Sequence, residues 1–314
     1  MKFHTDIQIS KASQPIEHSE KILMLGSCFA ENMEEKFANS GFRVCCNPFG
    51  TLYNPLSIAA CLQSLIDEKH FSAEDLRFSG GLYHSMLHHG RFSSADADEC
   101  LGMVNESIRQ GRMALQEADR LIITWGTAWV YEMEGKIVGN CHKLPASCFL
   151  RRRLTIEEII RSCSTLFQHP LLREKKVLIT VSPIRHIKDG LHENQLSKAT
   201  LLLAADQLVQ QANWTYFPAY ELMLDELRDY RFYAADMVHP SPVAIDYVWE
   251  RFAETQFSEN AQIAAKECEP YFLSLAHRPL HPESAVYQQF RKQMEARKLA
   301  LSEKYPYLHF EEKQ

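Results

Sequence analysis

Residues 21–31 read Lys-Ile-Leu-Met-Leu-Gly-Ser-Cys-Phe-Ala-Glu, and they are the most informative stretch of the chain. A short apolar run meets Gly26 and Ser27, and a helical pattern starts at once. α/β proteins use such a junction to place a polar side chain at the carboxyl end of a buried parallel strand. The partial positive charge of the helix N-terminus can stabilise an anion there. We therefore expect an α/β domain whose site lies at this strand end.

Four more short apolar runs have strand character, and helical patterns lie between them. The five runs are residues 21–25, 42–46, 121–125, 177–181 and 214–217. Alternating strands and helices predict a parallel, doubly wound sheet with right-handed crossovers. We predict a five-stranded sheet in the order 2-1-3-4-5, in which the loops after strands 1 and 3 open at the switch point where ligands bind.

Two features fall outside this simple α/β pattern. The connection from residue 47 to residue 120 is too long for one crossover, so we expect an insertion between strands 2 and 3. From about residue 258 the chain reads as amphipathic helix. We predict one hydrolase-like domain over residues 1–257 and a C-terminal helical extension over residues 258–314. The extension packs on the domain and could also pair two copies into a homo-oligomer.

Composition and charge favour an ordinary globular protein. The chain has 314 residues, of which 46% are hydrophobic and 24% charged, with a net charge of −6. No long basic run occurs, which argues against nucleic acid and anionic membrane as partners. No apolar stretch approaches the roughly 20 residues of a membrane span. The nine cysteines are scattered and form no Cys-x-x-Cys pair, so we expect reduced thiols and a cytoplasmic location.

Ser27 has two interpretations. A serine hydroxyl becomes a nucleophile when a base takes its proton, and the N–H groups of Ser27 and Cys28 could point at a developing oxyanion. Alternatively, Ser27 is only the N-cap of the helix, which is a common role of serine. Cys28 could itself be a nucleophile, but we expect its side chain to point into the first helical turn as a core residue.

Asp236 and His239 stand three residues apart, just before Pro240. At this spacing the Asp236 carboxylate can accept the imidazole Nδ1–H, which leaves Nε2 free as a base. The alternative is a local hydrogen bond that caps a helix beginning at Pro242. A doubly wound fold would bring this pair and Ser27 to one rim. We therefore predict a triad of Ser27, His239 and Asp236.

The sequence Gly26-Ser27-Cys28-Phe29-Ala30 spells the motif that names the GSCFA family, which is related to the SGNH/GDSL hydrolases. The chain resembles this family over most of residues 20–255. Further matching stretches are residues 47–55, 124–127, 139–143, 182–186 and 225–239. The resemblance implies a flavodoxin-like three-layer fold and ester hydrolysis, without naming a substrate.

The resemblance also implies roles for single residues. It assigns the nucleophile, the base, the acidic member and one glycine N–H of the oxyanion hole to Ser27, His239, Asp236 and Gly50. The third block of SGNH enzymes usually supplies an asparagine, but residues 126–129 here read Gly-Thr-Ala-Trp. We expect Thr127, through its hydroxyl, or Asn140, from the following loop, to take its place. A missing donor would lower turnover by about 10²–10³-fold.

Other polar or aromatic residues follow strands at the same rim. The expected substrate-binding residues are Trp125, His142, Arg185 and His186. Arg185 could hold a carboxylate or phosphate, and a structural ion pair is the alternative. His84 and His88 have the i, i+4 spacing of metal ligands on a helix. Because glycines flank them, we expect no sustained helix and no metal site there.

These observations predict a serine esterase that acts on a small-molecule or carbohydrate ester, such as an acetyl ester, and requires no cofactor. An acyltransferase would differ only in whether water or a sugar hydroxyl accepts the acyl group. A binding protein without turnover is the alternative from a different class, and the absent asparagine motivates it. No motif identifies the substrate.

Overall fold

The computed structural model describes residues 5–211, 214–277 and 279–310. Its centre is a parallel sheet with the strand order β10-β9-β5-β1-β2. The strands are β1 (Lys21–Gly26), β2 (Arg43–Cys46), β5 (Arg120–Trp125), β9 (Lys176–Val181) and β10 (Thr215–Phe217). Each coincides with one of the five apolar runs, and the α/β class is confirmed.

The strand numbers differ from the predicted 2-1-3-4-5 because five more strands lie outside this sheet. They are β3 (Leu76–Ser79) and β4 (Leu82–Ser85), and β6 (Trp129–Met133), β7 (Lys136–Ile137) and β8 (Leu150–Arg153). The β3–β4 hairpin lies in the expected insertion between β2 and β5. The β7-β6-β8 sheet follows β5, and the sequence does not predict it. Residues 150–153 read Leu-Arg-Arg-Arg, so β8 lacks the apolar alternation that marks a strand.

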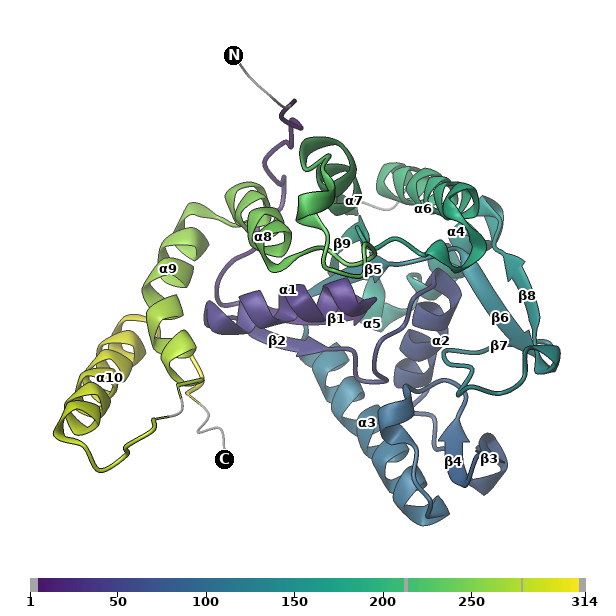
Figure 1. Ribbon diagram of the computed structural model, residues 1–314, viewed down its shortest axis with the longest axis horizontal. Helices are drawn as coiled ribbons and strands as arrows, with labels where there is room; N and C mark the ends of the chain where they lie inside the picture. The colour runs from purple at the N-terminus through teal and green to yellow at the C-terminus, as the bar shows by residue number, and fades with distance from the viewer. Residues whose placement is uncertain (1–4, 212–213, 278, 311–314) are drawn as a thin grey trace.

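Helices cover both faces of the central sheet and make three layers (Figure 1). Along β1, Leu23 and Leu25 face one core, whereas Ile22 and Met24 face the other. The first core is covered by α2 (Pro55–Ile66), α3 (Ala97–Glu117), α4 (Ile156–Leu166), α5 (Pro170–Arg173) and α6 (Leu191–Gln211). The second is covered by α1 (Cys28–Asn39), α7 (Ala219–Glu221), α8 (Pro242–Gln256) and α9 (Glu259–Ser274). Burial on both sides explains why the strands are almost continuously apolar.

The chain ends in α10 (Ala285–Lys304), which packs against α9. Figure 1 shows α10 at the left of the view, farther from the sheet than α9. Leu301 is the one buried residue of α10, and it joins a small cluster with Cys268, Tyr271 and Leu308. Residues 1–4 and 311–314, at the ends of the two predicted domains, lie outside the described residues. Across the described chain, none of the helices has both the length and the apolar character needed to cross a membrane.

His88 is part of the core. Its ring stacks on Phe49 with the centroids 4.0 Å apart, and its two nitrogens meet the hydroxyls of Ser85 at 2.7 Å and Ser107 at 3.2 Å. Burial lowers the pKa of His88 to about 3. Over the described residues, no group of three or more His, Cys, Asp or Glu side chains is placed to hold a metal ion.

We expect acid to destabilise the fold in part through His88. The unfolded chain protonates this imidazole near pH 6.5, whereas the folded chain does so only near pH 3. Because the unfolded state binds more protons in this window, the free energy of unfolding falls as the pH drops through it, by at most about 1.4 kcal/mol per pH unit. Urea unfolding at several pH values should therefore show a shallower pH dependence for His88→Gln. The exposed His192→Gln variant is the control, and an unchanged slope in His88→Gln would contradict the prediction.

Gly26 ends β1 in a conformation that suits glycine alone. Its φ is +151°, and a Cβ at this position would lie 2.2 Å from the carbonyl oxygen of Thr124 on the paired strand. We expect Gly26→Ala to lower the free energy of unfolding by about 3 kcal/mol or more. Gly135→Ala is the matched control, since φ is again positive but no atom lies within 4 Å, and its cost is about 1 kcal/mol. Urea unfolding measures both, and equal losses would show that the contact with Thr124 does not matter.

Candidate active site

Ser27 is buried beneath the end of β1. It is the N-cap residue of α1, with φ −70° and ψ 174°, and its side chain makes no capping hydrogen bond. Its exposed fraction is 0%, and its Oγ has no hydrogen-bond partner among the described residues. Its backbone N–H donates to the carbonyl of Thr124 at 3.3 Å. Neither the hydroxyl nor the N–H of Ser27 is therefore presented to an open cavity.

Cys28, the next residue, lines an open cleft that also contains His239. It is the first residue of α1, is partly exposed, and its Sγ lies 3.7 Å from Nε2 of His239. The expectation that Cys28 points into the core is met only in part, because the residue packs against the second core but its side chain also lines a cleft. Ser27 has extended backbone angles, and successive side chains of extended backbone point in opposite directions. Since Ser27 points into the protein, Cys28 points out.

The environment of the Cys28 thiol combines opposing effects. Burial raises the pKa of the thiol, and the nearby Glu31 carboxylate raises it further. The backbone N–H groups of Cys28 and Phe29, at the start of α1, act in the opposite direction, as does the Lys198 ammonium. Because burial is the largest effect, the thiol needs a base to remove its proton.

Asp236 and His239 lie together on a loop of residues 229–239, which we call the histidine loop. Asp236 Oδ2 lies 2.6 Å from Nδ1 of His239, and Oδ1 accepts the backbone N–H groups of Val238 at 2.9 Å and His239 at 3.0 Å. Met237 completes this turn with φ +59°. The donors from His239 and Val238 lower the pKa of Asp236 to about 2. The predicted pairing is therefore present, and the local backbone fixes its geometry.

Arg185 holds the histidine loop from outside. Its backbone N–H donates to the carbonyl of Val238 at 3.1 Å, and its guanidinium donates to that of Met237, also at 3.1 Å. The guanidinium also lies over the rings of Tyr230 and Tyr233, 5.7 and 5.2 Å from their centroids. Among the described residues no carboxylate forms an ion pair with Arg185, although its alternative interpretation required one. It acts first as a positioning residue for the loop.

Cys28 and His239 open into a cleft of about 460 Å³, which we call the triad cleft. Its lining comprises Cys28, Tyr53, Asn54, Thr127, Trp129, Tyr131, residues 138–141, Arg151, residues 184–189, Val238 and His239. The β7-β6-β8 sheet thus forms one wall. On that wall the Arg151 guanidinium lies 4.6 Å from the ring centroid of Trp129 and pairs with Asp189. The cleft can admit a small polar or aromatic molecule next to the thiol.

Sequence comparison identifies the family. A model described as the GSCFA family matches residues 21–252, which is well over half of the chain. The chain belongs to the GSCFA family. A second model, described as the C-terminal domain of GSCFA domain proteins, matches residues 273–314. No curated protein matches this chain. The family match includes Cys28, Asp236 and His239 but states no activity.

Gly50 does not border the triad cleft of this GSCFA protein. Its N–H donates to the carbonyl of Asn47 at 2.7 Å, within a turn. A Cβ at Gly50 would lie 2.2 Å from Cβ of His89, so the residue is a close-packing point between two loops. The oxyanion role expected for Gly50 is not supported by this geometry, because its donor is already occupied.

Thr127 and Asn140 both line the triad cleft. The Thr127 hydroxyl is 3.0 Å from Oγ of Ser197 and accepts the N–H of Trp129 at 3.1 Å, so it holds its own loop. Asn140 uses Oδ1 to accept the N–H of His142 at 2.9 Å. Its side-chain NH₂ makes no hydrogen bond to any described residue. Of the two expected substitutes, Asn140 has the free donor.

Trp125 and His142 do not reach the triad cleft. Trp125 is 1% exposed and belongs to the main core, because it continues the inward alternation of β5. The His142 Nε2–H donates to the carbonyl oxygen of Ser85 at 2.9 Å, and the ring stacks on that of His84 with the centroids 4.4 Å apart. The prediction that Trp125 and His142 contact substrate is therefore wrong for this arrangement.

His186 does line the cleft, close to a lysine that the sequence does not single out. The His186 Nε2 is buried and has no partner among the described residues, and burial, with Lys198 and His239 adding to it, lowers its pKa to about 3. Lys198 is 1% exposed, and its Nζ donates to the carbonyls of Gly126 and Ser182, both at 2.7 Å. Burial lowers the pKa of Lys198 to about 7. Lys198 thereby ties together the ends of β5 and β9 beneath the cleft.

Proposed function

We propose that this GSCFA protein is an acyl hydrolase or acyltransferase that uses Cys28 as its nucleophile. The observation that carries the proposal is the 3.7 Å contact between Cys28 Sγ and His239 Nε2. Asp236 is hydrogen-bonded to the other ring nitrogen of His239. A nucleophile, a base and a group that orients the base are the parts of covalent acyl transfer. Ser27, the nucleophile expected from the sequence, lacks this contact.

The proposed reaction begins when His239 Nε2 takes the proton of the Cys28 thiol. The thiolate sulfur attacks the acyl carbon, and the N–H groups at the start of α1, with the Asn140 amide, stabilise the oxyanion. The C–O bond then breaks, and the leaving alcohol takes the proton from His239, which leaves a thioester on Cys28. Water or a second hydroxyl, deprotonated by His239, then attacks the thioester carbon. The C–S bond breaks, the acyl group leaves as an acid or a new ester, and His239 returns the proton to the Cys28 sulfur. Asp236 holds the imidazole in the required tautomer throughout.

Several observations support the wider setting of the proposal. The Asp-x-x-His loop facing a nucleophile at the first strand–helix junction is consistent with a relation to the SGNH/GDSL hydrolases. Small-molecule or carbohydrate esters are the substrate class that we infer from the size of the triad cleft and from polar residues in its lining, such as Asn140 and Arg151. All nine cysteines are free thiols, which supports a reducing compartment such as the cytoplasm.

A binding protein without turnover is the second candidate. The observation that favours it is the occupation of expected oxyanion donors, since the Gly50 N–H and the Thr127 hydroxyl are both engaged. On this proposal the triad cleft would hold an ester or sugar without cleaving it.

Mass-spectrometric mapping after incubation with p-nitrophenyl acetate separates these candidates. We expect acetyl on Cys28, at a rate that His239→Gln lowers. The exposed Cys148 is the internal reference for unassisted thiol acetylation.

A fluorophosphonate probe should leave Ser27 unlabelled. Acylation of Ser27 would contradict the proposed nucleophile. Acetylation of Cys28 no faster than Cys148, with no turnover of other acyl or sugar esters, would favour the binding protein.

A further inference from the structure

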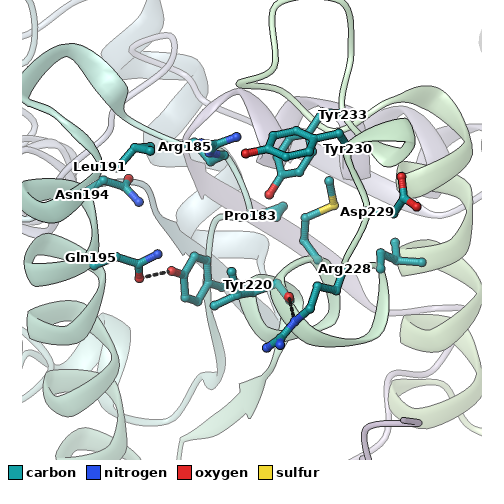
Figure 2. Close-up of a pocket in the computed structure, with 13 residues that line it drawn as sticks. Pro183, Arg185, Leu191, Asn194, Gln195, Tyr220, Arg228, Asp229, Tyr230 and Tyr233 are labelled. Carbon is teal, nitrogen blue, oxygen red and sulfur yellow. Dashed lines mark hydrogen bonds between the residues drawn. The ribbon is translucent and has the colours of Figure 1, made fainter. Parts of the chain in front are cut away.

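A second cavity lies beside the triad cleft, and the triad does not account for it. We call it the tyrosine pocket, and its volume is about 270 Å³. Figure 2 shows the rings of Tyr220, Tyr230 and Tyr233 around it, with Leu191, Asn194 and Gln195 on the facing helix α6. Met223, Leu224 and Leu227 also line it. The lining is therefore dominated by aromatic and aliphatic side chains.

Apolar side chains are left open to solvent at this pocket. Leu191 is 53% exposed, Leu224 37% and Tyr230 64%. A group of exposed large apolar residues beside a cavity often marks a binding surface, whereas single exposed apolar residues are ordinary. An apolar ligand that covered them would gain the free energy of removing that surface from water.

Some polar groups of the pocket are paired within the protein. The Tyr220 hydroxyl donates to Oε1 of Gln195 at 2.7 Å, and Asn194 Oδ1 accepts the backbone N–H of His186 at 2.9 Å. The Arg228 guanidinium pairs with Asp225. Because eight of the thirteen lining residues are aromatic or aliphatic, the pocket suits an apolar group better than a sugar or a charged ligand.

The tyrosine pocket and the triad cleft are built from the same two loops. Pro183 lines the pocket, while Ile184 and His186 line the cleft. On the histidine loop, Tyr230 and Tyr233 line the pocket, while His239 lines the cleft. Arg185 is the one residue that lines both cavities. A molecule that reacts at Cys28 could thus extend past Arg185 into the pocket.

A local irregularity of the chain shapes the pocket. Residues Leu222–Glu226 form a π-helical turn, η5, directly after α7. This turn supplies Met223 and Leu224 to the lining. Single π-helical turns are rare, and they occur frequently at functional sites.

We propose that the tyrosine pocket binds an apolar acyl chain of several carbons, and that the substrates of Cys28 carry such a chain. This inference rests on the proposed function, and it changes the expected substrate from an acetyl ester to a longer acyl ester. The chain would lie among the three tyrosine rings while the carbonyl carbon faces Cys28. Arg185 lies where the two cavities meet, and its guanidinium is fixed by the carbonyl of Met237 and the rings of Tyr230 and Tyr233.

The first test measures binding without chemistry. Isothermal titration calorimetry with sodium octanoate and sodium acetate uses the full chain and needs no turnover. We expect octanoate to bind at least tenfold more tightly than acetate. Leu224→Trp, which fills the pocket, should abolish this difference. Leu203→Trp is the matched control, because Leu203 is also an exposed leucine, on α6, but lines neither cavity. Equal binding of octanoate by wild type and Leu224→Trp would overturn the assignment of the pocket.

The second test measures acylation of Cys28 by p-nitrophenyl octanoate and p-nitrophenyl acetate. We expect kcat/KM to be at least tenfold higher for the octanoate ester than for the acetate ester. A tenfold ratio is small compared with the free energy gained by burying several methylene groups. Leu224→Trp should reduce the preference to nearly one, and Leu203→Trp should keep it. Acylation without chain-length preference would overturn the inference but leave the proposed function intact. Octanoate binding that Leu224→Trp abolishes, with no acylation by either ester, would support the apolar site and refute the proposed function.

Discussion

Replacing Cys28 by alanine is expected to lower ester turnover by about 10³-fold or more, whereas replacing Ser27 by alanine should change it less than about threefold. Removal of a nucleophile leaves only the catalysis that binding and the oxyanion donors provide. Cys28 is the residue whose side chain contacts His239. The Ser27 hydroxyl is buried without a partner. The assay is the initial rate of hydrolysis of an activated ester at neutral pH.

The stability of the two variants provides an independent check. A buried hydroxyl without a hydrogen bond has lost its contacts with water, so its removal is nearly neutral or stabilising. We therefore expect Ser27→Ala to unfold at the same urea concentration as wild type or a slightly higher one. A folded Ser27→Ala that has lost its activity, beside an active Cys28→Ala, would return the nucleophile to Ser27.

Cys28→Ser separates the chemistry of sulfur from its position. A serine hydroxyl at residue 28 occupies nearly the same place, but its proton is much harder to remove. We expect Cys28→Ser to retain a folded structure and to lose most of the turnover. Its residual rate should still depend on His239, which the double variant with His239→Gln measures.

The sequence predicts the sheet well because burial on both faces leaves a direct signal. The runs that become β1, β5 and β9 are continuous apolar segments, and such segments have few alternatives in an α/β pattern. These continuous apolar runs also explain the error at Trp125, because they do not show which face of the sheet each side chain takes. Trp125 ends its strand at the expected rim, but its side chain faces the core. Successive side chains of a strand point to opposite faces of the sheet, and the position of the following loop does not show which face the last residue takes.

The error at Cys28 has a similar cause. The sequence locates the strand–helix junction correctly, but which of two neighbouring side chains faces the cavity depends on the backbone angles of Ser27. Asp236 and His239 could be paired from the sequence because the contact is local. Lys198 carried no sequence signal, since one lysine in a long helix is ordinarily exposed. Its burial arises only when the ends of β5 and β9 meet α6.

Replacing Asp236 by asparagine is expected to lower turnover by about 10²-fold or more without unfolding the protein. The amide oxygen can still accept the N–H groups of Val238 and His239 that Asp236 Oδ1 now binds. The amide NH₂, however, would face Nδ1 of His239 and donate to it. Nε2 would then carry the ring hydrogen and could not take the proton of Cys28. The expected loss is smaller than for a fully buried triad because the Asp236 side chain is 49% exposed.

The pH dependence and a matched control sharpen this last prediction. Because the pKa of Asp236 is lowered to about 2, its carboxylate remains charged at every pH above about 3, so acid inactivation above that pH should not follow its titration. Asp225→Asn is the control. Asp225 is an exposed carboxylate that lies just before the histidine loop and pairs with Arg228. This variant should leave turnover unchanged. Full activity in Asp236→Asn would show that His239 does not depend on this carboxylate, and the triad would reduce to a Cys28–His239 dyad.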